Sequence, residues 1–154
     1  MELNKMGKIK TITICSSASF YEKVFEFKEK LEDLGFKVKV PLTANKMKKR
    51  GDFKVENYKT WFKNKEDYKI KTKLMKHHFQ KVIEVDAILV LNFEKRGLEG
   101  YIGGNVLMEM AIAFQNKKPI YILNPVSDSL ATKEEVLGLQ PIILNGNLGL
   151  IKRV

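Results

Sequence analysis

The 154-residue chain carries 28 Lys and Arg against 18 Asp and Glu, a formal net charge of +10, and 44% hydrophobic residues. This length suits one α/β domain spanning residues 1–154 and leaves too little chain for two. The single cysteine excludes an internal disulfide framework, and the apolar runs are too short to span a membrane. With no signal-peptide core at its start, the chain is expected to be cytoplasmic.

The positive charge comes mainly from lysines, many of which lie in residues 37–81. A basic surface attracts phosphate-bearing partners, so nucleic acid is one candidate partner. The alternative is a solvated lysine-rich face that keeps the protein soluble. The second interpretation is favoured because the sequence contains no recognisable nucleic-acid motif.

The first part of the chain predicts a strand, a helix and a second strand. Residues 9–14 have high β propensity, and residues 20–34 carry apolar side chains at helical spacing. Residues 36–40 alternate between apolar and charged side chains, as a strand does, and Pro41 ends the run.

A loop of small hydroxyl residues, Ser16, Ser17 and Ser19, follows the first strand. It lies at the carboxyl edge of the predicted sheet, where α/β proteins bind ligands. These serines are candidates for holding a phosphate or sugar hydroxyls, and the alternative is that they cap the next helix.

The basic segment 42–65 is expected to be a long loop or a short helical excursion over that edge. Its Trp61 is interpreted as an anchor to the body of the protein, with stacking on a base as the alternative.

Residues 66–85 then predict a helix, with Ile70, Leu74, His78 and Val82 along one row. His78 should therefore face inward or toward a pocket, as either a core residue or a catalytic one. The adjacent His77 should point elsewhere. No cysteine or carboxylate has matching spacing, so no metal site is predicted.

Residues 86–92 predict a buried third strand, with Asp86 at its amino end and Asn92 at its ligand-binding carboxyl end. The last part of the chain predicts a strand over 119–123, a turn beginning at Asn124, a short helix over 131–139 and an edge strand over 141–144.

Between the third and fourth strands lies a glycine-led apolar segment, Tyr101 to Phe114, whose one charged residue is Glu109. Gly103 and Gly104 allow a tight turn and leave room for a ligand, and Asn105 is a candidate N-cap. A lone carboxylate on so apolar a helix needs a reason, because burying an unpaired charge is costly. Glu109 is therefore the leading candidate for a catalytic residue.

Five strands with intervening helices predict a doubly wound, flavodoxin-like or Rossmann-like sheet, mainly parallel, in the order 2-1-3-4-5. The G-x-G-x-x-G and P-loop patterns are both missing, which argues against NAD and ATP. No cofactor is expected.

Several segments together resemble the nucleoside 2-deoxyribosyltransferase-like superfamily, which includes the deoxynucleoside 5′-monophosphate N-glycosidases. They are the serine loop, the 86–92 strand, the Gly103–Ala113 turn and helix, and the strand that ends at Asn124. Tyr101–Asn105, Met108–Met110 and Pro141–Gly146 look most like an uncharacterised subgroup of short proteins in that superfamily.

The resemblance implies that Glu109 is a nucleophile that attacks C1′ of the sugar as the base departs, by the logic of retaining glycosidases. It also implies a nucleoside or nucleotide substrate and a homo-oligomer. Three positions depart from the enzyme pattern: His78 replaces an aspartate, Thr13 a tyrosine, and Gly103 an aspartate or serine. The cytokinin-activating phosphoribohydrolases, with Gly-Gly-x-Gly-Thr-x-x-Glu, are a weaker match.

Two functions follow as hypotheses. The first is an N-glycosidase or deoxyribosyltransferase with Glu109 and His78 as catalytic residues. The second is a binding module that holds a nucleotide in the same pocket without turnover. A purely structural role remains open for Glu109, as a buried side chain that holds the sheet edge together through the serine loop or His78.

Overall fold

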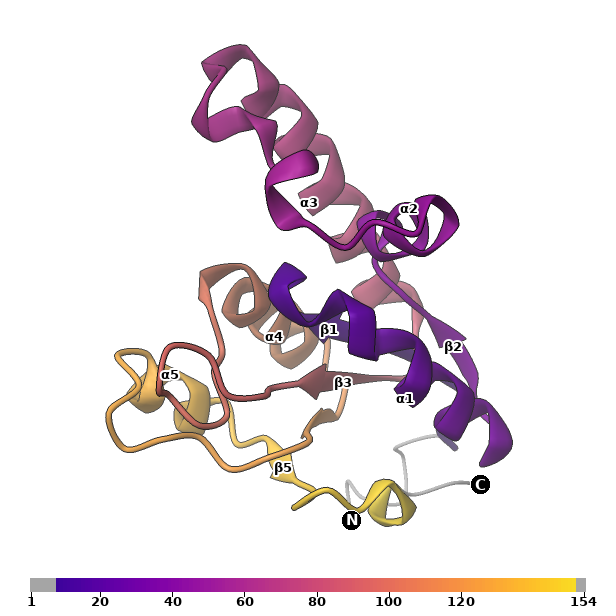
Figure 1. Ribbon diagram of the computed structural model, residues 1–154. Coiled ribbons are helices and arrows are strands. Elements are labelled where there is room, and N and C mark those ends of the chain that lie inside the picture. The colour runs from indigo at the N-terminus through magenta and orange to yellow at the C-terminus, as the bar shows by residue number, and fades with distance from the viewer. Residues whose placement is uncertain (1–7, 152–154) are drawn as a thin grey trace.

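The computed structural model describes residues 8–151, which form a five-stranded sheet in the order β2-β1-β3-β4-β5 (Figure 1). The strands are β1 (Thr11–Ser16), β2 (Lys37–Lys39), β3 (Ala87–Leu91), β4 (Ile120–Ile122) and β5 (Ile142–Ile143). All neighbouring pairs are parallel. The doubly wound fold class and the strand order are therefore confirmed, and the sheet is parallel throughout.

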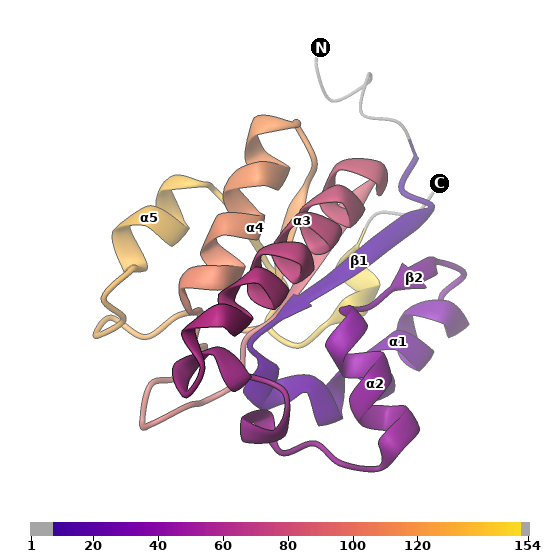
Figure 2. The same ribbon diagram turned by 90° about the horizontal axis from the view of Figure 1, so that it is seen from above.

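The helices cover the two faces of the sheet unequally. They are α1 (Tyr21–Asp33), α2 (Leu42–Arg50), α3 (Tyr68–Glu84), α4 (Gly104–Gln115) and α5 (Lys133–Gly138). Helix α1 packs on one face, whereas α3, α4 and α5 cover the other and lie side by side in Figure 2. None of the helices in residues 8–151 is long and apolar enough to cross a bilayer.

Alternation along β1 decides which side chains meet which helices. Ile12 and Ile14 belong to the core on the α1 face, whereas Cys15 belongs to the core beneath α3 and α4. Successive strand residues point to opposite faces, so Ser16 points away from the face that Cys15 occupies. This placement separates the Ser16 side chain from the side chains on α3 and α4.

The segment 42–65 is more regular than a long loop, and the short helical excursion is confirmed as α2. Pro41 precedes the helix, Ala44 and Met47 bury one side of it, and Gly51 ends it with a φ of 65°. Three 3₁₀ turns then lead to α3: Val55–Asn57, Thr60–Phe62 and Lys65–Asp67.

Helix α3 is buried only in its second half. His78 and Val82 are buried as the apolar row predicts, but Ile70 on the same row is 47% exposed. Figure 1 shows why: the amino-terminal part of α3 extends beyond the sheet. The carboxyl-terminal half alone therefore has a sheet to pack against.

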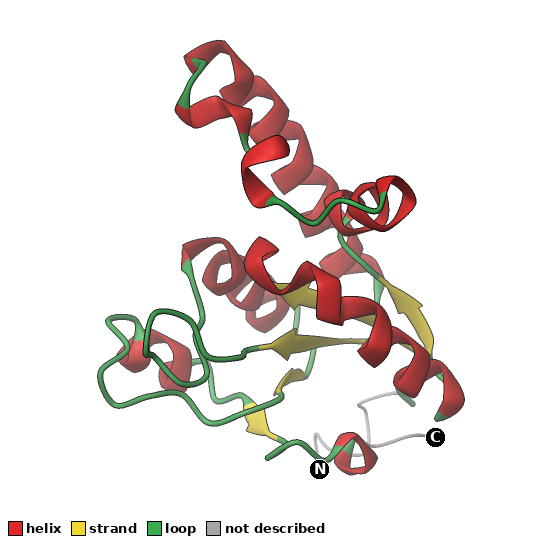
Figure 3. Ribbon diagram, viewed as in Figure 1, coloured by secondary structure: helices red, strands yellow, loops and turns green. Residues whose placement is uncertain are grey.

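Two long loops follow β3 and β4 at the same end of the sheet, drawn in green in Figure 3. The Ser127 amide donates to the Glu99 carbonyl (2.9 Å) and joins them. Gly100 has a φ of 64°, and an added Cβ would overlap the Pro125 carbonyl oxygen. Close approach of the two loops thus requires glycine here.

Asp86 is a structural residue at the opposite edge, as its position at the strand start predicts. Its Oδ2 accepts hydrogen bonds from the Lys10 amide (2.9 Å), the Thr11 amide (3.0 Å) and the Thr11 hydroxyl (3.1 Å). Partial burial raises the pKa of Asp86, but these hydrogen bonds outweigh it and lower the pKa overall.

We expect Asp86→Asn to lower the free energy of unfolding at pH 7 by about 1.5–3 kcal/mol, because the three hydrogen bonds lose their charged acceptor. A carboxyl whose pKa is lower in the folded state stabilises above its unfolded value of about 3.9, and this stabilisation disappears as pH falls through the folded value. Urea unfolding at several pH values should show the wild type and variant converging in acid. The exposed Asp33→Asn is the control and should change little; a constant gap down to acid pH would contradict this account.

Candidate functional site

A pocket lies between the carboxyl end of β1 and the helices α3 and α4, and α2 and the 3₁₀ turns border its outer side. It encloses about 590 Å³, including the part open to solvent. The space in it that is free for the centre of a water molecule is about 60 Å³, so a substrate would also occupy the part of the pocket that is open to solvent. Its polar side chains include Tyr21, His78, Asn105 and Glu109. The pocket therefore contains both predicted catalytic residues.

Glu109 lies in the second turn of α4 and is only 3% exposed. Its Oε1 accepts a hydrogen bond from the Asn105 amide group at 3.1 Å. Its Oε2 makes no hydrogen bond within the described chain and lies 3.4 Å from His78 Nε2. One carboxylate oxygen is thus held in place and the other is left without a hydrogen-bond partner.

Asn105 positions Glu109 and does not cap the helix. The N-cap of α4 is Gly103, without a side-chain hydrogen bond, so the prediction of Asn105 as N-cap was wrong. Asn105 instead lies one turn before Glu109 and donates to it. Its Oδ1 accepts from Lys71 Nζ at 3.1 Å, which fixes the amide orientation. A chain of contacts therefore runs from Lys71 through Asn105 to Glu109.

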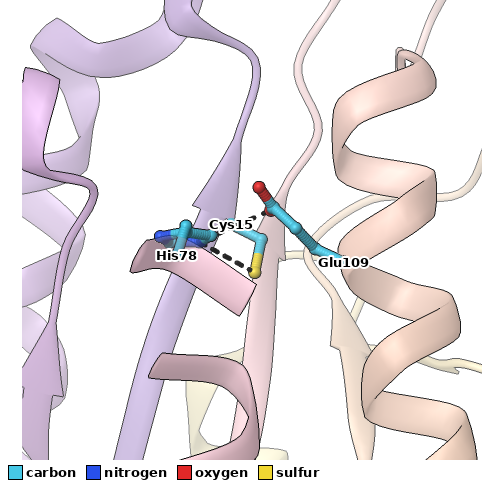
Figure 4. A group of neighbouring side chains, drawn as sticks. All are labelled: Cys15, His78 and Glu109. Carbon is cyan, nitrogen blue, oxygen red and sulfur yellow. Dashed lines mark hydrogen bonds and ion pairs between the residues drawn. The ribbon is translucent and has the colours of Figure 1, made fainter. Parts of the chain in front are cut away.

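His78 and Cys15 meet Glu109 from two other elements (Figure 4). Cys15 Sγ lies 3.6 Å from His78 Nε2, and both side chains are buried. His78 Nδ1 has no hydrogen-bond partner among residues 8–151. The predicted inward orientation of His78 is confirmed, whereas His77, expected to point elsewhere, is exposed and also borders the pocket.

The charge of Glu109 acts on two neighbouring groups. Burial raises the pKa of the Cys15 thiol well above its usual value, and the negative charge of Glu109 raises it further. Burial, followed by the charges of Glu109 and Cys15, also raises the pKa of Tyr21. Both groups are therefore neutral at physiological pH, and Tyr21 is available as a hydroxyl donor in the pocket.

Two half-buried lysines, Lys59 and Lys71, line the outer part of the pocket. Neither forms a salt bridge among residues 8–151. Desolvation lowers the pKa of both amines, and the Lys59 charge lowers that of Lys71 further. Lys71 also lies 5.5 Å from the centroid of the Trp61 ring. The arrangement favours an anion close to an aromatic ring.

The predicted serine loop lies outside the side chains that line this pocket. Ser16 is buried and donates to the Ser17 carbonyl at 3.0 Å, and Ser19 is exposed. Ser17 precedes the 3₁₀ turn Ala18–Phe20 without a side-chain cap. Of this loop, Ala18 borders the pocket.

Asn92 and Asn124 bind each other. Asn92 Nδ2 donates to the Asn124 carbonyl (2.7 Å) and the Gly100 carbonyl (3.2 Å), and Asn92 Oδ1 accepts from the Asn124 amide (2.9 Å). Asn124 Nδ2 returns a bond to the Asn92 carbonyl (3.0 Å). These contacts tie the ends of β3 and β4 together, and neither side chain lines the pocket.

The predicted glycines shape the start of α4 and do not line the pocket. Gly104 is exposed and faces open space, whereas a Cβ on Gly103 would lie 3.1 Å from the Tyr101 hydroxyl oxygen. Thr13, on β1, is buried and donates to the Lys39 carbonyl (3.3 Å). Two of the three positions that depart from the enzyme pattern therefore lie outside the pocket.

Sequence reasoning did not identify Cys15, Tyr21, Lys59 or Lys71 as site residues. The position of Tyr21 in the sequence could have identified it, because it lies at the start of the helix that follows the first strand, at the ligand-binding edge of the sheet. The lysines had no such signal, since they belong to a segment where most residues are basic or polar. Trp61 is buried, as an anchor should be, and it also borders the pocket.

Comparison of the sequence with protein-family models and with curated proteins finds no match.

Proposed function

We propose that the protein cleaves or exchanges the bond between base and sugar in a nucleoside or nucleotide, with Glu109 as nucleophile. The observation that carries the proposal is the Glu109 carboxylate, which is buried at a pocket with Oε1 fixed by Asn105 and Oε2 without a hydrogen bond. A carboxylate held ready against a developing oxocarbenium centre is what retaining glycosyl chemistry requires.

In the proposed reaction Glu109 Oε2 attacks C1′ while the C1′–N bond breaks, and the base leaves with the bonding electrons and takes up a proton. Water, or another base, then attacks C1′ of the glycosyl ester and releases the Glu109 carboxylate. His78 is the neighbouring titratable side chain (3.4 Å) and would orient a sugar hydroxyl or protonate the leaving base. Tyr21 supplies a further hydroxyl donor.

Lys59 and Lys71 support a phosphate-bearing substrate over a neutral nucleoside. A phosphate between the two amines would relieve their mutual repulsion and replace part of the hydration they lose in the pocket. The apolar and aromatic side chains nearby suit a base and a sugar ring. They include Leu42, Met47, Tyr58, Trp61, Leu74 and Met75.

The direct test is to incubate chelator-treated protein with a panel of nucleosides and nucleoside 5′-monophosphates. The panel contains both the ribose and the deoxyribose form of each substrate, and free base is measured by chromatography. Release of one base from a small group of monophosphates is expected. A second free base in the mixture separates transfer from hydrolysis, since transfer yields a new nucleotide. No base release from any substrate would reject the proposal.

The charge preference has its own test. We expect Lys59→Met to raise KM for the monophosphate about 10–150-fold, because a charge-assisted hydrogen bond contributes about 1.5–3 kcal/mol. KM for the parent nucleoside should change much less. The exposed Lys63→Met, in the same segment but outside the pocket, is the control. Equal effects on both substrates would show that Lys59 does not bind phosphate.

A non-catalytic nucleotide-binding module is the second candidate. The placement of Thr13 and Gly103 outside the pocket favours it, because the enzymes of the resembled superfamily carry functional side chains at those positions. Binding of a monophosphate in a thermal-shift screen, without any base release, would select this alternative.

A further inference from the structure

We propose that Cys15, His78 and Glu109 form a binding site for a zinc-type divalent ion at the base of the pocket. Their ligand atoms lie within 4.8 Å of one another, and all three residues are buried. Figure 4 shows the three side chains converging from β1, α3 and α4. Within residues 8–151 this is the one group of three such residues with ligand atoms so close together.

Two of the three separations between ligand atoms match a tetrahedral zinc centre, and the third, from Cys15 Sγ to Glu109, is within 4.8 Å. With Zn–S of about 2.3 Å and Zn–N and Zn–O of about 2.0–2.2 Å, the sulfur and nitrogen lie about 3.6 Å apart and the nitrogen and oxygen about 3.4 Å apart. The observed Cys15 Sγ to His78 Nε2 distance is 3.6 Å, and the His78 Nε2 to Glu109 Oε2 distance is 3.4 Å.

One of the atoms that would face the ion, Glu109 Oε2, is otherwise unsatisfied within residues 8–151. Glu109 Oε2 makes no hydrogen bond within the described chain, although its side chain is only 4% exposed. Its other oxygen is already bonded to Asn105 (3.1 Å), which leaves Oε2 free as a ligand. A buried carboxylate oxygen without a partner is costly, and a cation would remove that cost.

The donor set selects the class of metal. A thiolate, an imidazole and a carboxylate suit zinc and related transition metals, whereas Mg²⁺ and Ca²⁺ prefer oxygen ligands. Three protein ligands leave a fourth position open, and we expect it to be reached from the pocket because two of the ligands, His78 and Glu109, line the pocket. Binding converts the Cys15 thiol to a thiolate and releases its proton to solvent.

This site goes beyond the proposed function and does not rest on it. The metal and the sugar would use the same Glu109 oxygen, so the two states exclude each other. Zinc should therefore compete with the nucleotide, and removal of zinc should restore access to the carboxylate.

The test uses the full chain without a histidine tag, stripped with chelator and titrated with Co²⁺ as the spectroscopic substitute for zinc. We expect one equivalent to bind, with the visible bands of tetrahedral Co²⁺ and a thiolate-to-cobalt charge-transfer band in the near ultraviolet. Free Zn²⁺ at about 100 times its Kd should raise Tm by about 5–10 °C, and Mg²⁺ should not.

Two single-residue variants test whether Cys15 and His78 bind the metal. Cys15→Ser should lose the charge-transfer band, and His78→Ala should weaken binding by more than the roughly 10–100-fold typical of an outer-shell partner. His77→Ala is the matched control, because this neighbouring histidine borders the same pocket but is exposed, and it should bind as the wild type does.

If the charge-transfer band is missing when wild-type protein is titrated with Co²⁺, the proposed metal site is wrong. This outcome does not depend on whether the variants fold. Equal loss of binding in His77→Ala and His78→Ala also overturns the metal site. Base release is measured separately in the presence of chelator. If the protein binds metal but releases no base, the proposed function is wrong and the metal site is not affected. Base release without metal binding would reject the metal site alone.

Discussion

Glu109→Gln is expected to reduce base release by at least about 1,000-fold, because the amide cannot act as the nucleophile at C1′. Glutamine keeps the shape of the side chain, and its carbonyl oxygen can still accept the hydrogen bond from Asn105. The fold should be preserved, since the substitution removes a buried charge and adds no volume. The measurement is kcat/KM for base release in chelator, with Tm and circular dichroism as folding controls.

A second variant separates a nucleophile from a carboxylate that only stabilises charge. Glu109→Ala leaves space for a small external nucleophile such as azide or formate. If Glu109 forms the covalent intermediate, added azide should restore base release and yield a glycosyl azide. Base release that is unchanged in Glu109→Gln would exclude Glu109 from the chemistry.

Gly100→Ala is expected to lower the free energy of unfolding by about 3–5 kcal/mol, the largest stability effect we predict. Alanine at a φ of 64° costs about 1–2 kcal/mol, and its Cβ would also overlap the Pro125 carbonyl oxygen. The two loops at the carboxyl end of the sheet would have to separate. For a chain of this length Tm should fall by roughly 6–20 °C in a calorimetric scan.

Gly97→Ala is the matched control for that measurement. Gly97 lies in the same loop with a φ of 79°, but no atom comes within 4 Å of an added Cβ. It should therefore show the backbone cost alone, about 1–2 kcal/mol. If the two variants lose equal stability, overlap with the Pro125 carbonyl oxygen contributes nothing to the stability loss of Gly100→Ala.

A purely structural role does not explain why one carboxylate oxygen of Glu109 has no hydrogen bond among the described residues. A residue that holds the sheet edge should hydrogen-bond a different element, but the Glu109 hydrogen bond comes from Asn105 on its own helix. The His78 contact, at 3.4 Å, leaves Oε2 without an aligned hydrogen bond. The same contact with His78 connects α4 to α3, so Glu109 can contribute to the packing and still act as the nucleophile.

The sequence by itself determined the layers of the protein. Short apolar or alternating segments, such as residues 9–14, 36–40 and 87–91, predict strands, and the longer stretches between them with helical spacing predict the helices that cover the sheet. The same logic predicted that His78 faces inward, and the burial of Glu109 followed from the apolar helix around it. The orientation of His78 and the burial of Glu109 depend on the residues near them in the sequence, so the local spacing of apolar residues is enough to predict both.

Only the tertiary structure decided which polar side chains meet. Asn92 and Asn124 end adjacent strands, as the predicted site residues should, yet they satisfy each other. Cys15 reaches His78 and Glu109 because β1 alternation aims it at the α3 and α4 face, on the opposite side from Ser16. Residues 63 or more positions apart become neighbours through packing, and their spacing in the sequence contains no trace of that contact.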